Sequence, residues 1–322
     1  MTEFDPQRIL PPEISYSIQT EAPDPSSALR STLPAVLPAA LISSIVSVVV
    51  SVFAALLFFF PVSCSKAADT GTAPRTDEYL AERDTEEVFD DFLGRILQNA
   101  EIPDPIARQI KEAAANGPSF IMDLLTCISG DPQLYALVDK AHALPTGYAP
   151  DDLVQLAGTA GGDSYEISRH GLMLRESAAI ALEEMAAAAR ADGITLIAGS
   201  TYRSYDYQVG VYNRNVEESG QETADRESAR PGYSQHQTGL VVDFAPIDDT
   251  FAATPAGAWA LRNASAFGWS LSFPDGYEPV TGYRWESWHY RYVGRDLAAF
   301  IDTYFNGIQQ YALRFIYEWH QE

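Results

Sequence analysis

The longest run of apolar positions lies near the N-terminus, at residues 35–60. No charged residue interrupts this run, and it is long enough to cross a bilayer with some tilt. It is too long for a typical signal-peptide core, and about thirty polar residues precede it. We therefore predict one retained transmembrane helix at residues 34–62. A buried core helix and the apolar part of a signal peptide are the alternatives.

The segments beside this run differ from it in composition. Residues 1–33 carry several prolines and acidic groups without a hydrophobic period, which is typical of a disordered tail. Residues 63–76 are predicted to be a linker. Basic residues stand on both sides of the apolar run, so the positive-inside rule gives no orientation. Cys64 follows a poor version of a lipoprotein cleavage box, so its lipidation remains an alternative to a plain anchor.

The next segment, residues 77–142, has apolar residues at three- and four-residue steps, which predicts helices. Three prolines stand where helices are expected to begin, at Pro103, Pro105 and Pro118. The pattern predicts three or four short helices. We interpret them as a helical spacer that holds a catalytic domain away from the membrane, because the segment carries no candidate chemistry.

The pattern changes after the turn-rich residues 144–150, and residues 143–322 are predicted to form the catalytic domain. Helices and short strands are segregated here, which indicates an α+β fold. The expected helices lie at residues 175–190 and 297–319, with another through Gln208. The expected strands lie at residues 194–198, 241–244 and 288–292.

Charge and cysteine content exclude several functions. The 322 residues carry a formal net charge of −23, which argues against a nucleic-acid partner, because binding to phosphates needs clustered Lys and Arg. An anionic substrate would have to be met by a local cation rather than by the overall field. The two cysteines are too few for a disulfide framework or a cysteine-rich zinc motif.

Two stretches near the C-terminus together offer the ligands of one metal ion. The first runs from Ser234 to Asp243 and contains His236, and the second contains Glu286 and His289. Two imidazoles and one carboxylate leave the fourth position of a tetrahedral Zn²⁺ open for water, as in catalytic sites. Other divalent ions can occupy such a set. Glu286 is the spare carboxylate that could take a proton from metal-activated water.

The spacing of these residues requires irregular backbone. His236 and Asp243 are an odd number of residues apart, so an unbroken strand would place them on opposite faces. We expect a bend at Thr238 and Gly239, because glycine tolerates the dihedral angles of a bulge. Beyond it, Asp243 should face away from the core. Glu286 and His289 are also an odd number of residues apart, so a regular strand would place them on opposite faces. We therefore expect Glu286 to lie at the entry to its strand, where it can turn toward the metal.

These motifs resemble those of the VanY-type zinc D-Ala-D-Ala carboxypeptidases, which are related to the D-alanyl-D-alanine dipeptidases and share a fold with Hedgehog signalling domains. The resemblance spans residues 143–295. The metal motif of that family, Ser-x-His-x-x-Gly-x-Ala-x-Asp, stands here as Ser234, His236, Gly239, Val241 and Asp243. Its Glu-x-Trp-His motif stands as Glu286, Trp288 and His289. A third motif stands as Tyr202, Arg203, Ser204 and Gln208.

The resemblance implies a fold and a set of zinc ligands. The fold would be a small antiparallel sheet flanked by helices. One Zn²⁺ ion would be bound by His236, Asp243 and His289. Val241 departs from the family's alanine, and its extra methyl groups put the substrate range in question rather than the activity.

The resemblance also implies catalytic roles. Glu286 would be the general base and acid, and Arg203 would stabilise the oxyanion of the tetrahedral intermediate. An acidic protein that handles a developing anion needs one well-placed guanidinium, which supports the role of Arg203. Ser234 and Gln208 would bind the substrate.

The function that these observations favour is a membrane-anchored zinc D,D-carboxypeptidase. It would remove the terminal D-Ala from peptidoglycan stem peptides, outside the cytoplasm at a bacterial inner membrane. An L,D-carboxypeptidase of the same fold acting on tetrapeptides is one alternative. A cell-wall-binding module without catalysis is another, and the presence of both Glu286 and Arg203 argues against it.

Overall fold

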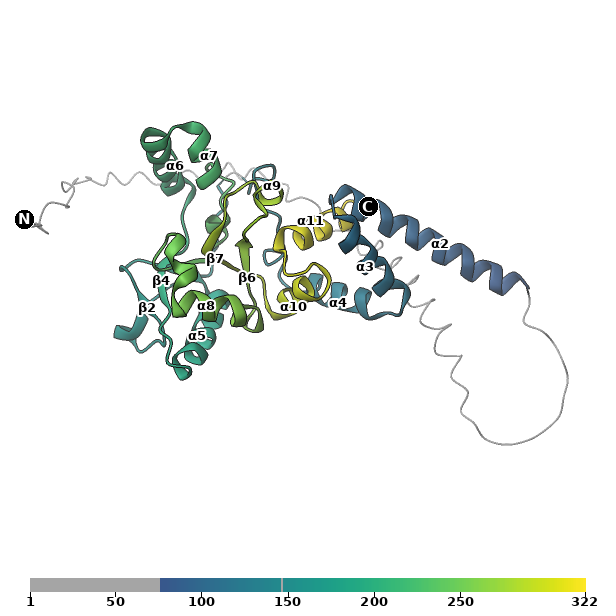
Figure 1. Cartoon of the computed structure of the whole chain (residues 1–322), viewed down its shortest axis with the longest axis horizontal. Coiled ribbons are helices and arrows are strands. Elements are labelled where there is room, and N and C mark those ends of the chain that lie inside the picture. The colour runs from purple at the N-terminus through teal and green to yellow at the C-terminus, as the bar shows by residue number, and fades with distance from the viewer. Residues whose placement is uncertain (1–75, 146) are drawn as a thin grey trace, which may run out of the picture. The chain divides into compact units, whose positions relative to one another are not determined.

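The computed structural model describes residues 76–145 and 147–322, and their side chains from residue 87 onward (Figure 1). The predicted tail at residues 1–33, the predicted membrane helix at residues 34–62 and nearly all of the linker at residues 63–76 lie outside the described residues. Among the helices that are described, none is both long enough and apolar enough to cross a bilayer.

Three helices open the described chain, as the prolines predicted. They are α2 (Thr76–Asn99), α3 (Asp104–Ala115) and α4 (Ser119–Ile128). Pro103 and Pro118 are the N-cap residues of α3 and α4, and Pro105 occupies the first turn of α3, where its missing N–H costs no hydrogen bond. The first helix is longer than the short helices that the sequence predicted.

The catalytic part is built on a five-stranded sheet in the order β2-β4-β5-β7-β6. Its strands are β2 (Glu166–Ile167), β4 (Ile197–Ser200), β5 (Val241–Phe244), β6 (Trp269–Phe273) and β7 (Glu286–Tyr292). A separate two-stranded ribbon pairs β1 (Leu153–Gln155) with β3 (Met173–Arg175). The α+β class is confirmed. The expectation of a wholly antiparallel sheet is wrong at one edge, where β2 runs parallel to β4.

Helices and short turns surround this sheet. The α-helices are α5 (Glu176–Ala191), α6 (Tyr205–Ser219), α7 (Gln221–Glu227), α8 (Pro255–Asn263), α9 (Glu278–Thr281), α10 (Arg295–Tyr304) and α11 (Gln309–Trp319). Short 3₁₀ helices are η1 (Gly158–Gly161), η2 (Gln235–Thr238), η3 (Asp249–Ala253) and η4 (Ala264–Phe267). The closing helix expected at residues 297–319 is two helices, because Asn306 and Gly307 adopt left-handed backbone with φ of 54° and 76°.

The two faces of the sheet differ in polarity, and this difference positions the site. On one face, alternate residues such as Leu240, Val242 and Tyr290 pack into a core with the apolar sides of α5 and α8. The opposite face carries buried polar side chains, among them Asp243 and His289. Because side chains alternate along a strand, each strand of the centre contributes to both faces.

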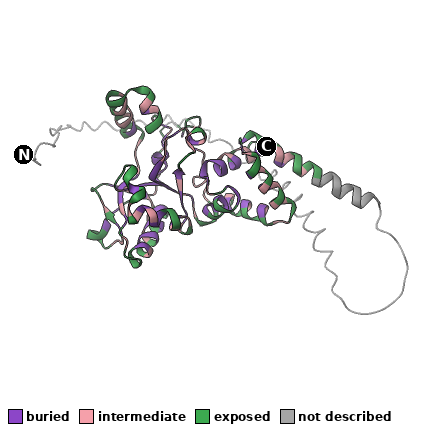
Figure 2. Cartoon of the chain, in the orientation of Figure 1, coloured by how far each residue is buried: buried purple, intermediate pink, exposed green. Residues whose placement is uncertain are grey.

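A second core joins the opening helices to the end of the chain. Buried residues of α2, α3 and α4 pack with those of α10 and α11 (Figure 2), and residues 74–322 form one compact unit. Phe120 of α4 lies at its centre, with ring centroids 5.0 Å from Tyr304 and 5.8 Å from Phe315. The opening helices are therefore part of the folded body. The spacer role of these helices, which would hold the catalytic domain away from a membrane, stays a prediction.

A buried cation links this helical layer to the polar face of the sheet. Arg291 of β7 is fully buried, and its Nη2 donates to the carbonyl oxygens of Gln133, Leu134 and Ala136 at 3.2, 3.3 and 2.8 Å. Burial lowers the pKa of Arg291 to about 10, so it stays charged at neutral pH. These bonds hold the connection after α4 against the strand that carries His289.

We expect Phe120→Ala to lower the free energy of unfolding by about 3–5 kcal/mol, because it removes a fully buried ring from the shared core. Met122→Ala on the same helix is the control, since Met122 is 53% exposed and its loss should change stability by about 0.5 kcal/mol or less. Chemical denaturation measures both. Equal stability of the two variants would mean that the opening helices do not share the core of the catalytic part.

Candidate metal centre and active site

The chain reaches the metal site through the bend that the spacing of His236 and Asp243 required. His236 lies in η2, and Gly239 follows with φ of 71° before β5 begins. A Cβ atom at Gly239 would lie 2.9 Å from Cγ of Arg175 and 3.0 Å from Cδ2 of Leu153, so a larger residue would fit neither the backbone nor the space. The predicted bend is confirmed.

A second irregularity brings Glu286 to the same side as His289. In the pairing of β6 with β7, Leu271 faces Tyr290 while Phe273 faces Glu286. Two steps along β6 thus match four steps along β7, which is a bulge in β7. Because a bulge breaks the alternation of side chains, both Glu286 and His289 can face the polar side.

The predicted ligands converge in one buried group. His236, Asp243 and His289 each place a ligand atom within 4.8 Å of the others, and all three residues are buried. Nε2 of His236 lies 3.1 Å from Oδ2 of Asp243, and Nδ1 of His289 lies 3.1 Å from its Oδ1. The carboxylate therefore stands between the two imidazoles, which come from different elements.

Contacts on the far side of each ring decide which nitrogen is free. Nδ1 of His236 lies 2.7 Å from the carbonyl oxygen of Thr201, which can only accept, so this nitrogen donates and Nε2 keeps its lone pair. Nε2 of His289 lies 3.2 Å from Oε1 of Gln235, so Nδ1 is the nitrogen directed at the carboxylates of Asp243 and Glu286. Such outer contacts orient metal-binding histidines. Both of these nitrogens face Asp243.

The donor set fits a metal ion. Nε2 of His236 and Oδ1 of Asp243 are buried and have no hydrogen-bond partner among the described residues. Unpaired buried acceptors are costly, and a cation satisfies them together. Two imidazoles with one carboxylate form a set that zinc uses in catalytic sites. The cofactor prediction of one zinc ion is confirmed to this extent: the chain holds the three ligands together.

The pKa values of the site follow from burial and from its charges. Burial, assisted by the nearby charge of Arg203, lowers the pKa of His236 to about 4, so this ring is neutral at neutral pH. Burial also lowers the pKa of His289, but Asp243 and Glu286 outweigh it and raise the value to about 9. The pKa of Asp243 lies well below its usual value despite burial, because His236 and His289 favour the carboxylate.

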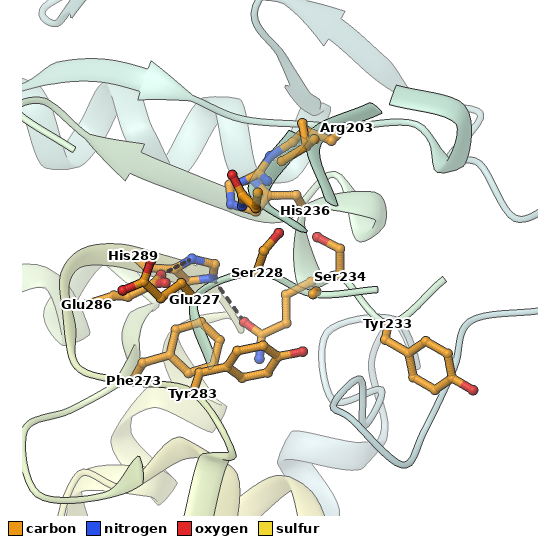
Figure 3. Close-up of a pocket in the computed structure, with 14 residues that line it drawn as sticks. Arg203, Glu227, Ser228, Tyr233, Ser234, His236, Phe273, Tyr283, Glu286 and His289 are labelled. Atoms are coloured by element: carbon orange, nitrogen blue, oxygen red, sulfur yellow. Dashed lines mark hydrogen bonds and ion pairs between the residues drawn. The ribbon is translucent and has the colours of Figure 1, made fainter. Parts of the chain in front are cut away.

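Glu286 lies beside the ligands. Its Oε2 is 3.2 Å from Nδ1 of His289, and the residue is 9% exposed. It lines a pocket of about 100 Å³ together with His236 and His289 (Figure 3). A carboxylate in this position lies next to the group that would hold a metal ion, and it also faces a ligand in the pocket.

Arg203 lines the same pocket from the segment after β4. Its Nη2 lies 3.3 Å from Oδ2 of Asp243 and its Nη1 donates to Oε1 of Gln208 at 3.1 Å. Its Nε is buried without a hydrogen-bond partner in the described part of the chain. The guanidinium is thus held beside the metal group with its Nε–H uncommitted.

The two predicted substrate-binding residues lie in different environments. Ser234 lines the pocket, as the prediction requires. Gln208 is fully buried and does not line it. Its Oε1 accepts from Arg203, and its Nε2 donates to the carbonyl oxygen of Ala229 at 2.7 Å. This placement differs from that of a substrate-binding residue, because both polar ends are used inside the protein. Gln208 instead orients Arg203.

Sequence reasoning missed several residues of the site. Gln235 orients His289, and its Oε1 is itself held by Ser272 Oγ at 2.8 Å. Phe273 and Tyr283 form an aromatic wall of the pocket, with ring centroids 4.9 Å apart. The position of Gln235 beside His236 was the only available signal for its role, and nothing in the sequence separated the two aromatic residues from ordinary core residues.

Comparison with known proteins gives the family of this chain. The family model for VanY, described as D-alanyl-D-alanine carboxypeptidase, matches residues 171–295. YodJ of Bacillus subtilis (strain 168), assigned as a carboxypeptidase, is 37% identical over 186 residues, which are 56% of this chain and 67% of YodJ. The chain belongs to the VanY family. It is therefore a peptidase, and the predicted family is confirmed.

Two solved structures are also similar. The LdcB LD-carboxypeptidase is 35% identical, with a TM-score of 0.48, and the match covers 55% of this chain and 88% of that one. The vancomycin-resistance D,D-pentapeptidase VanY from a VanB-type cassette, solved as a mutant with Zn(II), is 29% identical. Its TM-score is 0.46, and the match covers 55% of this chain and 96% of that one.

We expect His289→Ala to reduce bound zinc from one ion per chain to nearly none, because the two remaining protein ligands bind zinc only weakly. Metal analysis after dialysis against a weak chelator measures the stoichiometry. His170→Ala is the matched control, since His170 is exposed and lies outside the ligand group. Full retention of zinc by His289→Ala would remove His289 from the ligand set.

Proposed function

We propose that this protein is a zinc D,D-carboxypeptidase that removes the terminal D-Ala from peptidoglycan stem peptides. The observation that carries the proposal is the convergence of His236, Asp243, His289 and Glu286 on one buried group at a pocket. Membership of a family described as D-alanyl-D-alanine carboxypeptidases supports the substrate class.

The roles of the residues follow from their positions. His236, Asp243 and His289 would hold zinc, which when bound supplies a Lewis acid and makes a water molecule acidic. Glu286 would accept the proton of that water and later deliver it to the leaving amine. Its Oε2 lies 3.2 Å from Nδ1 of His289, beside the ligand group.

Arg203 would stabilise the negative charge that develops on the scissile carbonyl oxygen. It is held from behind by Gln208 and keeps Nε uncommitted. A guanidinium fixed in this way needs little reorganisation as the charge grows, which is the basis of electrostatic stabilisation of a transition state. Ser234 would bind the substrate from the wall of the pocket.

Glu286→Ala should lower kcat for release of D-Ala from a muramyl pentapeptide by about 10²- to 10⁴-fold, because it removes the general base and acid. Zinc content should stay at one ion per chain. Glu222→Gln is the matched control, since Glu222 is an exposed acid of α7 that does not line the pocket. The full chain is assayed for free D-alanine.

The same assay distinguishes the alternatives. Cleavage of a tetrapeptide but not of the pentapeptide would replace the proposal with an L,D-carboxypeptidase. Binding of zinc and of wall fragments without any cleavage would favour a non-catalytic wall-binding module. Undiminished cleavage by Glu286→Ala would leave the peptidase in place and assign the proton transfers to another group.

We also propose that the enzyme is anchored in the bacterial inner membrane by residues 34–62, with its catalytic part outside the cytoplasm. The support is the uncharged apolar run at residues 35–60, which is long enough to span a bilayer. A wall-linked substrate suits a tethered enzyme. Lipidation of Cys64 is the alternative form of attachment.

The anchor predicts that the full chain sediments with membranes and resists a high-salt wash, whereas a chain that begins at residue 74 stays in the soluble fraction. The shortened chain keeps the whole of the compact unit 74–322. Immunoblots of the two fractions measure the distribution. A full chain found in the soluble fraction would contradict the anchor, and membrane binding of Cys64→Ala would separate a plain anchor from lipidation.

A further inference from the structure

A second hollow adjoins the active-site pocket and is lined by three arginines. It is an open surface hollow of about 320 Å³, and Arg169, Arg203 and Arg214 contribute to its wall. Arg203, Val211 and Asn215 line both this hollow and the pocket that contains the metal ligands. The two spaces therefore share part of their lining, and a ligand that fills the pocket lies next to the hollow.

The parallel edge of the sheet explains why two of these arginines meet. Arg169 follows β2 by two residues and Arg203 follows β4 by three, and the carboxyl ends of parallel strands lie at the same edge. Ser168 fixes the first segment, because its N–H donates to the carbonyl oxygen of Ala198 at 2.9 Å and its Oγ to that of Gly199 at 3.1 Å. The sheet thus places both side chains beside one hollow.

The third arginine comes from α6, which presents one face to the hollow. Four residues of this helix line the hollow: Tyr207, Val211, Arg214 and Asn215. The last three follow Tyr207 by four, seven and eight residues, which puts all four on the same side of a helix. Arg214 is therefore directed to the hollow by the same periodicity that places Val211 in the shared lining. Figure 1 shows α6 beside α7, set apart from the strands of the sheet.

The charge of the hollow is not neutralised by its own wall. No Asp or Glu lines it. Within the described part of the chain, Arg169 and Arg214 have no carboxylate within 4.0 Å, whereas Arg203 contacts Asp243. The net charge of the whole chain is −23. The hollow is a local positive region in an acidic protein.

The rim of the hollow is apolar. Tyr207 and Ile247 line it and are 47% and 45% exposed. Gly199 makes room for Ile247, because a Cβ atom there would lie 2.8 Å from its Cδ1. Arginines bordered by exposed apolar side chains suit an acidic amino-acid side chain, whose methylene groups contact the rim while its carboxylate reaches the guanidinium groups. A phosphate group would use the arginines but not the rim.

We propose that this hollow, lined by Arg169, Arg203 and Arg214, binds a carboxylate of the substrate that lies outside the scissile bond. The enzyme then selects stem peptides that carry a free acid at that position over peptides in which the acid is an amide. The proposal rests on the proposed function, because it takes a peptide in the metal-site pocket as the starting point. It also explains how an acidic enzyme attracts an anionic substrate locally.

The test compares two muramyl pentapeptides that differ only in a side-chain carboxylate or carboxamide upstream of the terminal D-Ala-D-Ala. The full-length wild type should show kcat/KM up to about fivefold higher for the free acid, the size of an exposed Arg–carboxylate interaction. In the double variant Arg169→Gln/Arg214→Gln, the ratio of kcat/KM for the acid to kcat/KM for the amide should fall to near one. Arg108→Gln, an exposed arginine on α3, is the control and should keep the wild-type ratio.

Salt provides a second readout of the same ratio. Because Arg169 and Arg214 are exposed, higher ionic strength should lower the wild-type preference for the free acid, and it should leave the double variant at a ratio near one. An equal kcat/KM of the wild type for both peptides, or a ratio unchanged in the double variant, would overturn the proposal.

Binding of reaction products separates failure of this proposal from failure of the proposed function. Fluorescently labelled tetrapeptides in acid and amide forms are bound to chains that also carry Glu286→Ala, so that neither peptide is hydrolysed. Fluorescence anisotropy gives the Kd of each form. Preference for the acid form that is lost in the double variant supports the hollow even if no pentapeptide is cleaved. Equal Kd values, with inorganic phosphate binding that depends on Arg169 and Arg214, would replace the carboxylate with a phosphate-bearing ligand.

Discussion

The buried carboxylate of Asp243 is the constraint on which the rest of this structure depends. A carboxylate removed from water is costly unless it is paired and hydrogen-bonded. Here it stands between His236 and His289, with Arg203 at 3.3 Å. Each of these partners is held by a further contact. Thr201 holds His236, Gln235 holds His289, and Gln208 holds Arg203. The polar face of the sheet is therefore organised around one charge, and a metal ion completes its neutralisation.

The irregular features of the sheet make this arrangement possible. The left-handed Gly239 turns the chain from His236 into β5, and the bulge in β7 brings Glu286 to the side of His289. Regular strands would have divided the four groups between the two faces. The other face stays apolar and packs on α5 and α8, so the site gains a rigid support without losing its opening to the pocket.

The helical layer is linked to the site through the same strand. Arg291 lies two residues after His289 and donates to three carbonyl oxygens of the connection that follows α4. The core of α2, α3, α4, α10 and α11 lies behind it. A segment that looked like a spacer in the sequence thus supports the strand that carries a metal ligand. The opposite edge, where β2 and β4 run parallel, supplies the arginine-lined hollow.

The sequence alone determined the chemistry of the site, because the residue types and spacings of the metal motif and of Glu286 leave few other uses. It also determined the bend at Gly239, since parity allows no unbroken strand, and the helix starts at Pro103 and Pro118. Only the tertiary structure decided the rest. The roles of Gln208 and Gln235 depend on which groups face them, and the meeting of Arg169 with Arg214 depends on the pairing of β2 with β4 and on the packing of α6. Such contacts join residues far apart in the chain, and the local sequence pattern around each residue does not predict them.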